Sequence, residues 1–332
     1  MTVINGIEID NVKYIQNEIK EAIKNNDPIE DNLHVIIIIS NPCQYARRYI
    51  LAREFIKRFD DEQNIILYIV ELAFDNQNFY VTQNNNPRHL QIKTSTRPIW
   101  HKENMINMGV KNLLPKNWKA FAWIDADIEF DSSSWALDTL KILNGCRDVV
   151  QLFSHCSDLN KHEDPMRIFQ GFGFQYSKKK KYNLNGLNLW HPGFAWAITR
   201  KGYDRIGGLY DKSILGSGDH NMALSIIGDG LKSIDENTDI GYKKSILDYQ
   251  NKISKLRLGY TPGFIRHYFH GSKENRKYSE RWKILVKYQY DPFNHVTYDK
   301  NGLLIPSNNC PPGLLDDIYK YFSERNEDEG YI

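Results

Sequence analysis

A run of five consecutive β-branched residues at positions 35–39 (Val-Ile-Ile-Ile-Ile) constrains the fold of this chain more than any other feature. Such an unbroken apolar run predicts a strand buried on both faces, as in parallel sheets covered by helices. Residues 45–59 follow with apolar side chains at helical spacing, and residues 65–72 form a second apolar run. Strands that alternate with helices predict a parallel sheet with right-handed crossovers, whose ligands bind beyond the carboxyl ends of the strands.

The alternation continues and then becomes less regular. Residues 99–114 favour a helix that ends at Pro115, and residues 121–124 favour a third buried strand. The second half predicts strands at 149–153, 194–199 and 264–270, and helices at 219–227, 245–256 and 274–290. A loop-rich stretch with four successive lysines, 178–181, separates the first two of these strands. The predicted fold class is α/β, with a mixed, mainly parallel central sheet flanked by helices.

Charge and composition exclude several classes of partner. The 43 Lys and Arg residues are balanced by 41 Asp and Glu residues, and a net charge of +2 argues against nucleic acid as a partner. The apolar runs are far shorter than the roughly 20 residues that cross a bilayer, so no membrane span is expected. The first thirty residues lack the basic start and apolar core of a secretion signal, and the four scattered cysteines fit reduced thiols. These features predict a cytoplasmic location.

Two acidic residues, Asp125 and Asp127, stand one residue apart directly after the predicted strand at 121–124. Hard cations such as Mg²⁺ and Mn²⁺ prefer carboxylate and phosphate oxygens, so this pair fits a site for a metal and a diphosphate. An ordinary helix cap in front of a predicted helix at 132–143 is the alternative. The carboxyl end of a parallel strand is where ligands of such sheets bind, and this position favours the metal site.

A Gly-rich acidic segment, Gly-Ser-Gly-Asp-His-Asn at 216–221, precedes a predicted helix. The glycines allow the backbone to approach a ligand closely, and the helix N-terminus stabilises the carboxylate of Asp219. An ionised carboxylate can accept a proton from a hydroxyl group, which is the role of a general base. The alternative is a plain N-cap in a turn.

Three motifs in succession resemble those of the GT-A glycosyltransferases. They are Trp-Ile-Asp-Ala-Asp at 123–127, Pro-Gly-Phe-Ala-Trp-Ala at 192–197, and the acidic segment at 216–221. The resemblance extends over roughly residues 34–290. Among the GT-A enzymes, the chain resembles galactosyltransferases and N-acetylgalactosaminyltransferases. It implies a GT-A fold, a nucleotide-sugar donor such as a UDP-sugar, a divalent cation (Mn²⁺ or Mg²⁺), and an acceptor hydroxyl on a glycan, protein or small molecule.

The resemblance also assigns roles to residues. It implies Asp219 as the base of an inverting displacement, although a retaining course stays open, and a histidine that joins Asp125 and Asp127 around the cation. Strand alternation places His267 and His270 on different faces, and His270, at the end of the predicted strand, is the expected ligand. A core histidine beside a solvated basic helix is the alternative.

Further residues are expected to bind the donor or the acceptor. Topology and the resemblance assign the donor to Asn41, Pro42, Tyr45, Glu71, Lys102, Asn107, Ala126, Lys273 and Arg276. The sugar and acceptor are assigned to Trp190, Gly193, Phe194, Trp196 and His220, because aromatic rings suit the C–H faces of sugars. Core packing explains the aromatic residues equally well, and His220 fits a packing or surface role.

The predicted organisation has three parts. Residues 1–30 form an amphipathic helix that packs on the core, and residues 31–290 form the catalytic domain, with a nucleotide-binding half at 31–130 and a sugar- and acceptor-binding half at 131–290. Residues 291–332 form a helical C-terminal extension, whose acidic tail at 324–330 is expected to fray.

Two other functions compete with a glycosyltransferase. A nucleotidyltransferase that makes sugar nucleotides would use a related sheet and acidic metal site, but it needs a Gly-rich basic phosphate loop after the first strand. That loop is Ser-Asn-Pro-Cys at 40–43, without such glycines. A non-catalytic carbohydrate-binding protein on the same fold is the second competitor.

Overall fold

The computed structural model describes residues 32–144, 147–183 and 189–330, together with positions 3–4, 7–8 and 24. A seven-stranded mixed sheet forms the centre of this part of the chain. Its strands, in spatial order, are β13 (Leu258–Tyr260), β8 (Val149–Gln151), β12 (Ala195–Thr199), β6 (Ala120–Ile124), β3 (Leu33–Ser40), β4 (Ile65–Phe74) and β5 (His89–Thr94). Only β12 runs antiparallel to its neighbours in this sheet. The predicted mixed, mainly parallel α/β sheet is confirmed.

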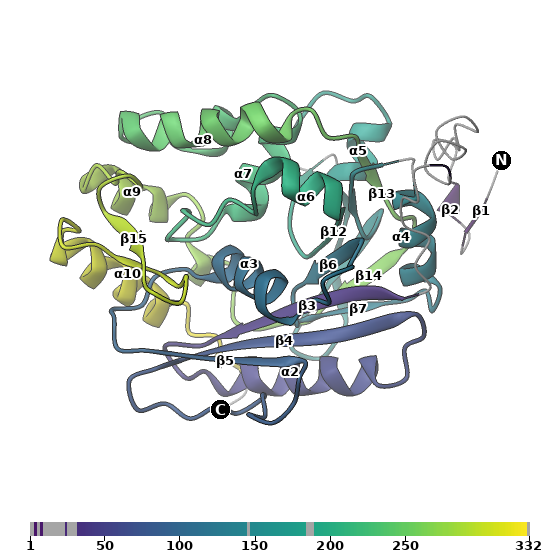
Figure 1. Ribbon diagram of the computed structural model, residues 1–332, viewed down its shortest axis with the longest axis horizontal. Coiled ribbons are helices and arrows are strands. Elements are labelled where there is room, and N and C mark those ends of the chain that lie inside the picture. Colours follow the sequence, from purple (N-terminus) through teal and green to yellow (C-terminus); the bar gives the residue numbers. More distant parts are fainter. Residues whose placement is uncertain are drawn as a thin grey trace.

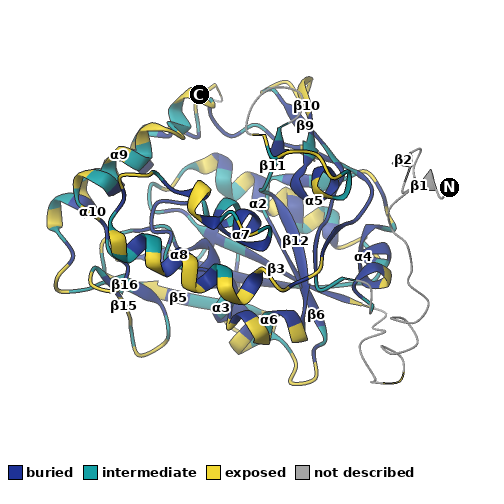
Figure 2. Cartoon of the chain, turned by 90° about the horizontal axis from the view of Figure 1, so that it is seen from above, coloured by how far each residue is buried: buried dark blue, intermediate teal, exposed yellow. Residues whose placement is uncertain are grey.

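Helices cover both faces of this sheet (Figure 1). On one side, α2 (Ala46–Phe59) and α4 (Trp135–Leu143) pack on Val35, Ile37 and Ile39 of β3. On the other side, where Ile36 points, lie α3 (Lys102–Leu113), α6 (Arg200–Ile206), α7 (Gly218–Ile226) and α8 (Ile240–Ile253). Figure 2 shows the resulting pattern, with buried central strands and exposed residues on the outer faces of the helices. The unbroken apolar run of β3 is needed because both of its faces are covered.

A second sheet of five described strands takes three of them from the stretch before β12 that the sequence predicts to be rich in loops. It contains β11 (Trp190–His191), β10 (Pro165–Gly171), β9 (His155–Leu159), β14 (Phe264–His267) and β7 (Ile128–Phe130) in spatial order, and α5 (Phe172–Ser177) follows β10. The prediction of loops was wrong for β9 and β10 because β9 carries mostly polar side chains, and residues 165–168 of β10 are exposed. Such strands lack the apolar pattern by which a sequence reveals them.

Two predicted elements near the C-terminus are shorter than expected. The strand predicted at 264–270 ends at His267, and the helix predicted at 274–290 is divided into η3 (Glu274–Arg276) and α9 (Glu280–Lys287). Lys277 between these two helices adopts a left-handed conformation with a φ of 41°, which interrupts a continuous helix.

The last described residues form the expected helical extension and a tail that is not frayed. A hairpin of β15 (Val296–Tyr298) and β16 (Leu304–Pro306) leads into α10 (Pro312–Glu324). Residues 325–330, which we call the C-terminal strap, then run against α2, and Glu327 within it is 1% exposed. The predicted fraying was wrong because the acidic side chains of the strap find buried cationic and N–H partners.

Within the predicted N-terminal helix of residues 1–30, positions 3–4 and 7–8 instead pair as the antiparallel strands β1 (Val3–Ile4) and β2 (Ile7–Glu8), and apart from position 24 the rest lies outside the described residues. Among the described residues, none of the helices has the length and the apolar composition that crossing a bilayer requires.

Candidate active site

A cavity of about 190 Å³ lies beyond the carboxyl ends of β3 and β6. Ten of the residues expected at the site from the sequence line it: Asn41, Pro42, Tyr45, Lys102, Asp125, Ala126, Asp127, Phe194, His270 and Arg276. The position agrees with the rule that ligands of parallel sheets bind beyond the strand ends. Residues that the sequence analysis did not assign also line it, among them Arg48, His267, Arg325 and Glu327.

The two carboxylates of the Asp-Ala-Asp segment make different contacts. Asp125 Oδ1 lies 2.5 Å from Nζ of Lys102, which also reaches Oδ2 of Asp219 at 2.9 Å. Asp127 Oδ2 lies 2.9 Å from Nε2 of His270. The segment therefore joins a lysine and acid cluster on one side to a histidine cluster on the other.

His267 approaches Asp127 as well, although sequence reasoning set it aside. Its Nε2 lies 3.8 Å from Asp127 Oδ2, because β14 pairs antiparallel with β7 and places His267 opposite Ile128. The strand ends there, and the N–H of Tyr268 donates to the Asp127 carbonyl at 2.8 Å. Strand alternation does not govern residues beyond His267, so both histidines reach the same carboxylate.

The three side chains of Asp127, His267 and His270 have a donor set that could hold a metal ion. One ligand atom from each lies within 4.8 Å of the others, and Oδ1 of Asp127 is buried without a hydrogen-bond partner. Two imidazoles and one carboxylate suit a transition-metal ion such as Mn²⁺ better than Mg²⁺, which prefers oxygen ligands throughout. Burial acts to raise the pKa of Asp127, but His270 and His267 together hold it well below its usual range. The residues present therefore fit a divalent cation.

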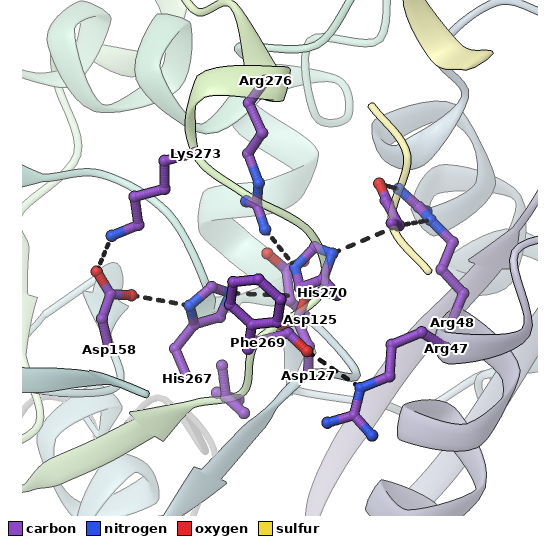
Figure 3. Close-up of polar contacts among 12 residues, drawn as sticks. Arg47, Arg48, Asp125, Asp127, Asp158, His267, Phe269, His270, Lys273 and Arg276 are labelled. Carbon is purple, nitrogen blue, oxygen red and sulfur yellow. Dashed lines mark hydrogen bonds and ion pairs between the residues drawn. The ribbon is translucent and has the colours of Figure 1, made fainter. Parts of the chain in front are cut away.

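Supporting contacts fix the His267 ring (Figure 3). Its Nδ1 lies 2.8 Å from Oδ1 of Asp158, a buried residue of β9, and Asp158 in turn contacts Nζ of Lys273. Carboxylates in this position set the orientation of metal-binding histidines. Lys273, expected to meet the donor, is used in this network and does not line the cavity.

Guanidinium groups line the side of the cavity next to His270. Arg276 Nη2 lies 2.7 Å from His270 Nε2, and Arg48 pairs with Glu327 at 2.5 and 2.7 Å. Arg325 Nε lies 2.7 Å from Glu327 Oε1, close enough for an ion pair although its N–H does not point along a hydrogen bond. Such groups suit the recognition of phosphate oxygens.

Lys102 and the acids around it occupy the opposite side. Burial raises the pKa of Asp125 to about 6, with Asp219 and Asp127 adding to the shift and Lys102 opposing it. Glu103 packs against Gly218, where no Cβ would fit, and burial with the nearby Asp219 raises its pKa to about 8. Asp219 does not line the cavity itself and is linked to it through Lys102.

Several predicted donor residues have structural contacts instead. The carboxylate of Glu71 accepts hydrogen bonds from the N–H groups of Tyr80, Val81 and Thr82, which order the loop after β4. The side-chain amide of Asn107 bonds the backbone of Leu209. Neither residue lines the cavity. Topology fixes the end of a strand but not the direction of each side chain, which is why these two predicted donor residues do not line the cavity.

Asn41 and Tyr45 line the cavity, but their polar groups also make hydrogen bonds that stabilise the fold. Asn41 bonds the backbone N–H and carbonyl of Tyr45, closing the turn before α2. The Tyr45 hydroxyl donates to the carbonyls of Phe322 and Ser323, which fastens α10 to this turn.

Of the aromatic residues expected to stack on sugars, one lines the cavity and two belong to the core. Phe194 lines the cavity, whereas Trp190 and Trp196 are 2% and 0% exposed and belong to the core. His220 bonds Tyr182 at 2.7 Å, and burial lowers its pKa to about 4. Gly193 lies beside His191, where an added Cβ would meet the ring at 3.0 Å. For both tryptophans the core-packing alternative applies.

No protein-family model matches the chain, and no curated protein matches its sequence. The chain is similar to two solved structures. One is the catalytic domain of Drosophila β1,4-galactosyltransferase 7 in complex with xylobiose, at 10% identity and a TM-score of 0.36, covering 86% of this chain and 98% of that one. The other is glucosyl-3-phosphoglycerate synthase from Mycobacterium tuberculosis with Mn²⁺, UDP-glucose and phosphoglyceric acid, at 9% identity and a TM-score of 0.36, covering 89% and 91%. At these identities and TM-scores the similarity carries no information on the activity of this chain.

Proposed function

We propose that this chain is a glycosyltransferase that moves a sugar from a nucleotide-sugar donor, such as a UDP-sugar, to an acceptor hydroxyl with the help of a divalent cation. One observation carries the proposal. A single cavity combines the cation-binding set of Asp127, His267 and His270 with the guanidinium groups of Arg48 and Arg276. A nucleoside diphosphate presents both features that such a cavity recognises, metal-binding oxygens and negative charge.

The donor's diphosphate is bound from two sides in this proposal. Asp127, His267 and His270 would hold the cation, with Asp125 beside them, and a bound cation supplies Lewis-acid stabilisation of the charge that develops on the leaving diphosphate. Arg276 orients the phosphate oxygens through the planar fork of its guanidinium donors, and Arg48, which is paired with Glu327, adds positive charge to this side of the cavity. Phe194, partly facing the cavity, gives the sugar an apolar surface.

Asp219 is proposed as the general base of an inverting displacement. Lys102 bonds its Oδ2 at 2.9 Å, which fixes the carboxylate, and the other oxygen, Oδ1, accepts the proton of the acceptor hydroxyl as that oxygen attacks the anomeric carbon. The bond from the anomeric carbon to the diphosphate breaks in the same step, so the diphosphate leaves with the electron pair.

A binding and hydrolysis screen tests the proposal. The purified chain is tested by thermal shift against a panel of nucleotide sugars, each with Mn²⁺, Mg²⁺ or EDTA, and release of the nucleoside diphosphate is measured in parallel. One donor should raise Tm in a cation-dependent manner, since a ligand at 100 times its Kd stabilises a protein by about 2.7 kcal/mol. In the Asp127→Asn variant, the part of this rise in Tm that depends on the cation should be lost.

The outcomes separate the competing functions. Binding of a donor without turnover in any acceptor screen would favour a carbohydrate-binding protein. Formation of pyrophosphate from a nucleoside triphosphate and a sugar 1-phosphate would indicate a nucleotidyltransferase. Failure of every donor to bind with any cation would overturn the glycosyltransferase proposal.

A further inference from the structure

The C-terminal strap, residues 325–330, reaches the cation-binding set from outside the predicted catalytic region. We propose that Glu327 of this strap is a positioning residue for His270, so that the strap completes the cation site. This inference rests on the proposed function in one respect, namely that the site of Asp127, His267 and His270 takes a cation. It assigns a role to a residue that neither motif nor topology indicates.

The two ring nitrogens of His270 face different partners. Nε2 lies 2.9 Å from Asp127 Oδ2, and Nδ1 lies 3.4 Å from Glu327 Oε2. Arg276 Nη2 is 2.7 Å from Nε2, and a guanidinium has only donors, so Nε2 accepts from it and the ring proton belongs on Nδ1. Glu327 is the acceptor that keeps the proton there. With the proton on Nδ1, the lone pair of Nε2 accepts from Arg276 here, and a cation beside Asp127 Oδ2 would bind that lone pair in place of the Arg276 N–H.

Glu327 is held rigidly enough to orient the ring. It is 1% exposed, and Arg48 donates to both of its oxygens at 2.5 and 2.7 Å. Asp328, the next residue, accepts from the backbone N–H groups of Ala46 and Arg47 at 3.0 and 2.8 Å. The strap is therefore anchored to the start of α2 through the Glu327 carboxylate and through Asp328 beside it.

The backbone after His270 also touches the strap. Gly271 has a φ of +85°, and an added Cβ would lie 3.0 Å from the Cα of Glu327 and 3.1 Å from the carbonyl oxygen of Asn326. Only glycine allows this approach, both for the left-handed conformation and for the space. The strap thus fixes the backbone that carries His270 as well as its ring. His267 has a comparable arrangement with Asp158, so each histidine of the set has its own supporting carboxylate.

The experiment measures Mn²⁺ affinity of the full chain by titration calorimetry and by electron paramagnetic resonance of free Mn²⁺. Glu327→Gln should weaken binding about 10- to 100-fold, the usual effect of removing a supporting carboxylate. Glu329→Gln is the matched control, since Glu329 is an exposed acid of the same strap that bonds Asn275. Its Mn²⁺ affinity should equal that of the wild type.

A double-mutant cycle separates positioning from a structural role. In a His270→Ala background, Glu327→Gln should have no further effect on Mn²⁺ affinity, because its partner ring is gone. Should Glu327→Gln fail to fold, Glu327→Asp retains the charge for Arg48 while withdrawing the carboxylate from the ring, and it should still weaken Mn²⁺ binding. Unchanged affinity in the folded variant, or losses that add in the double variant, would overturn the inference. If the wild type binds no Mn²⁺, the cation part of the proposed function fails first, and the inference with it.

Discussion

Nζ of Lys102 lies 2.9 Å from Oδ2 of Asp219, and this contact joins the start of α3 to the start of α7 across the candidate site. The same ammonium group is 2.5 Å from Asp125, and its side chain is 9% exposed. The buried Lys102 ammonium group therefore compensates the charges of both acids. Burial acts to lower the pKa of Lys102, but Asp125 and Asp219 together raise it above its usual value.

Removal of the Lys102 ammonium group should destabilise the fold. Lys102→Met leaves Asp125 and Asp219 without their partner, and breaking a buried ion pair from one side typically costs about 3–5 kcal/mol. Denaturant unfolding of the variant measures the change. Lys111→Met, an exposed lysine of the same helix, is the control and should stay within about 0.5 kcal/mol of the wild type. Equal stability of the two variants would contradict the buried cluster.

Both histidines should contribute to cation binding. His267→Ala and His270→Ala are each expected to weaken Mn²⁺ affinity at least about 10-fold, and Asp158→Asn should do so through the orientation of His267. Mg²⁺ should bind the wild type more weakly than Mn²⁺, because two of the three ligand atoms are imidazole nitrogens. Calorimetry gives all the affinities, with the exposed His162→Ala as the control. A His267→Ala variant with wild-type affinity would exclude His267 from the site.

Glu103 makes stability depend on pH. Its pKa is about 8 in the folded protein against an ordinary value of 4.5, so the folded state holds the proton more tightly than the unfolded chain. This contribution is fully present below pH 4.5 and is lost as the pH rises through about 8. Glu103→Gln removes the loss, so its free energy of unfolding should exceed that of the wild type by an amount that grows as the pH rises from about 4.5 to about 8 and is constant above that. A shift of one pKa unit corresponds to about 1.4 kcal/mol.

Urea unfolding at several pH values measures this difference. Glu54→Gln, an exposed acid of α2, serves as the control and should follow the wild-type pH dependence. Parallel curves for the wild type and Glu103→Gln would show that Glu103 is not protonated in the folded state.

Trp196 should act as a core residue and not as a surface for sugar. Its side chain is fully buried, and its indole N–H donates to the Pro192 carbonyl at 2.8 Å. Trp196→Ala should therefore cost about 3–5 kcal/mol of stability. Guanidinium unfolding tests this, and Tyr80→Ala, which truncates an exposed ring, should cost much less. A stable Trp196→Ala protein with weakened donor binding would restore the sugar-stacking role.

Asp328 should act as the cap of a helix that lies far from it in the sequence. Its carboxylate accepts from two N–H groups at the N-terminus of α2, where no side chain of the neighbouring residues provides a cap. Asp328→Ala should cost about 0.5–2 kcal/mol, the usual effect of losing an N-cap. The Tm of the variant, with Glu329→Ala as the control, checks this. A cost no larger than that of the control would contradict capping from the strap.

Local patterns in the sequence were sufficient for the central sheet and for part of the site. Runs of β-branched and aromatic residues predict β3, β4 and β6, because a strand covered on both faces needs an apolar side chain at almost every position. The acids at 125 and 127 follow β6 directly, so the sequence alone places them at the edge of the sheet where ligands bind. Six of the expected site residues line the cavity for this reason, namely Asn41, Pro42 and Tyr45 after β3, and Asp125, Ala126 and Asp127 after β6.

Only the tertiary structure decided how these residues are paired. His267 reaches Asp127 through the antiparallel register of β14 and β7, and Lys102 reaches Asp125 from a different helix. The strap residue Glu327 reaches His270 from the far end of the chain, and its acidic surroundings in the sequence suggested a frayed tail. Such pairs leave no local pattern, since the register of two strands and the packing of a tail depend on contacts between distant segments. The sequence by itself determined the buried strands β3, β4 and β6 and the edge of the sheet at which ligands bind, and the packing of the strands, helices and strap determined which side chains meet.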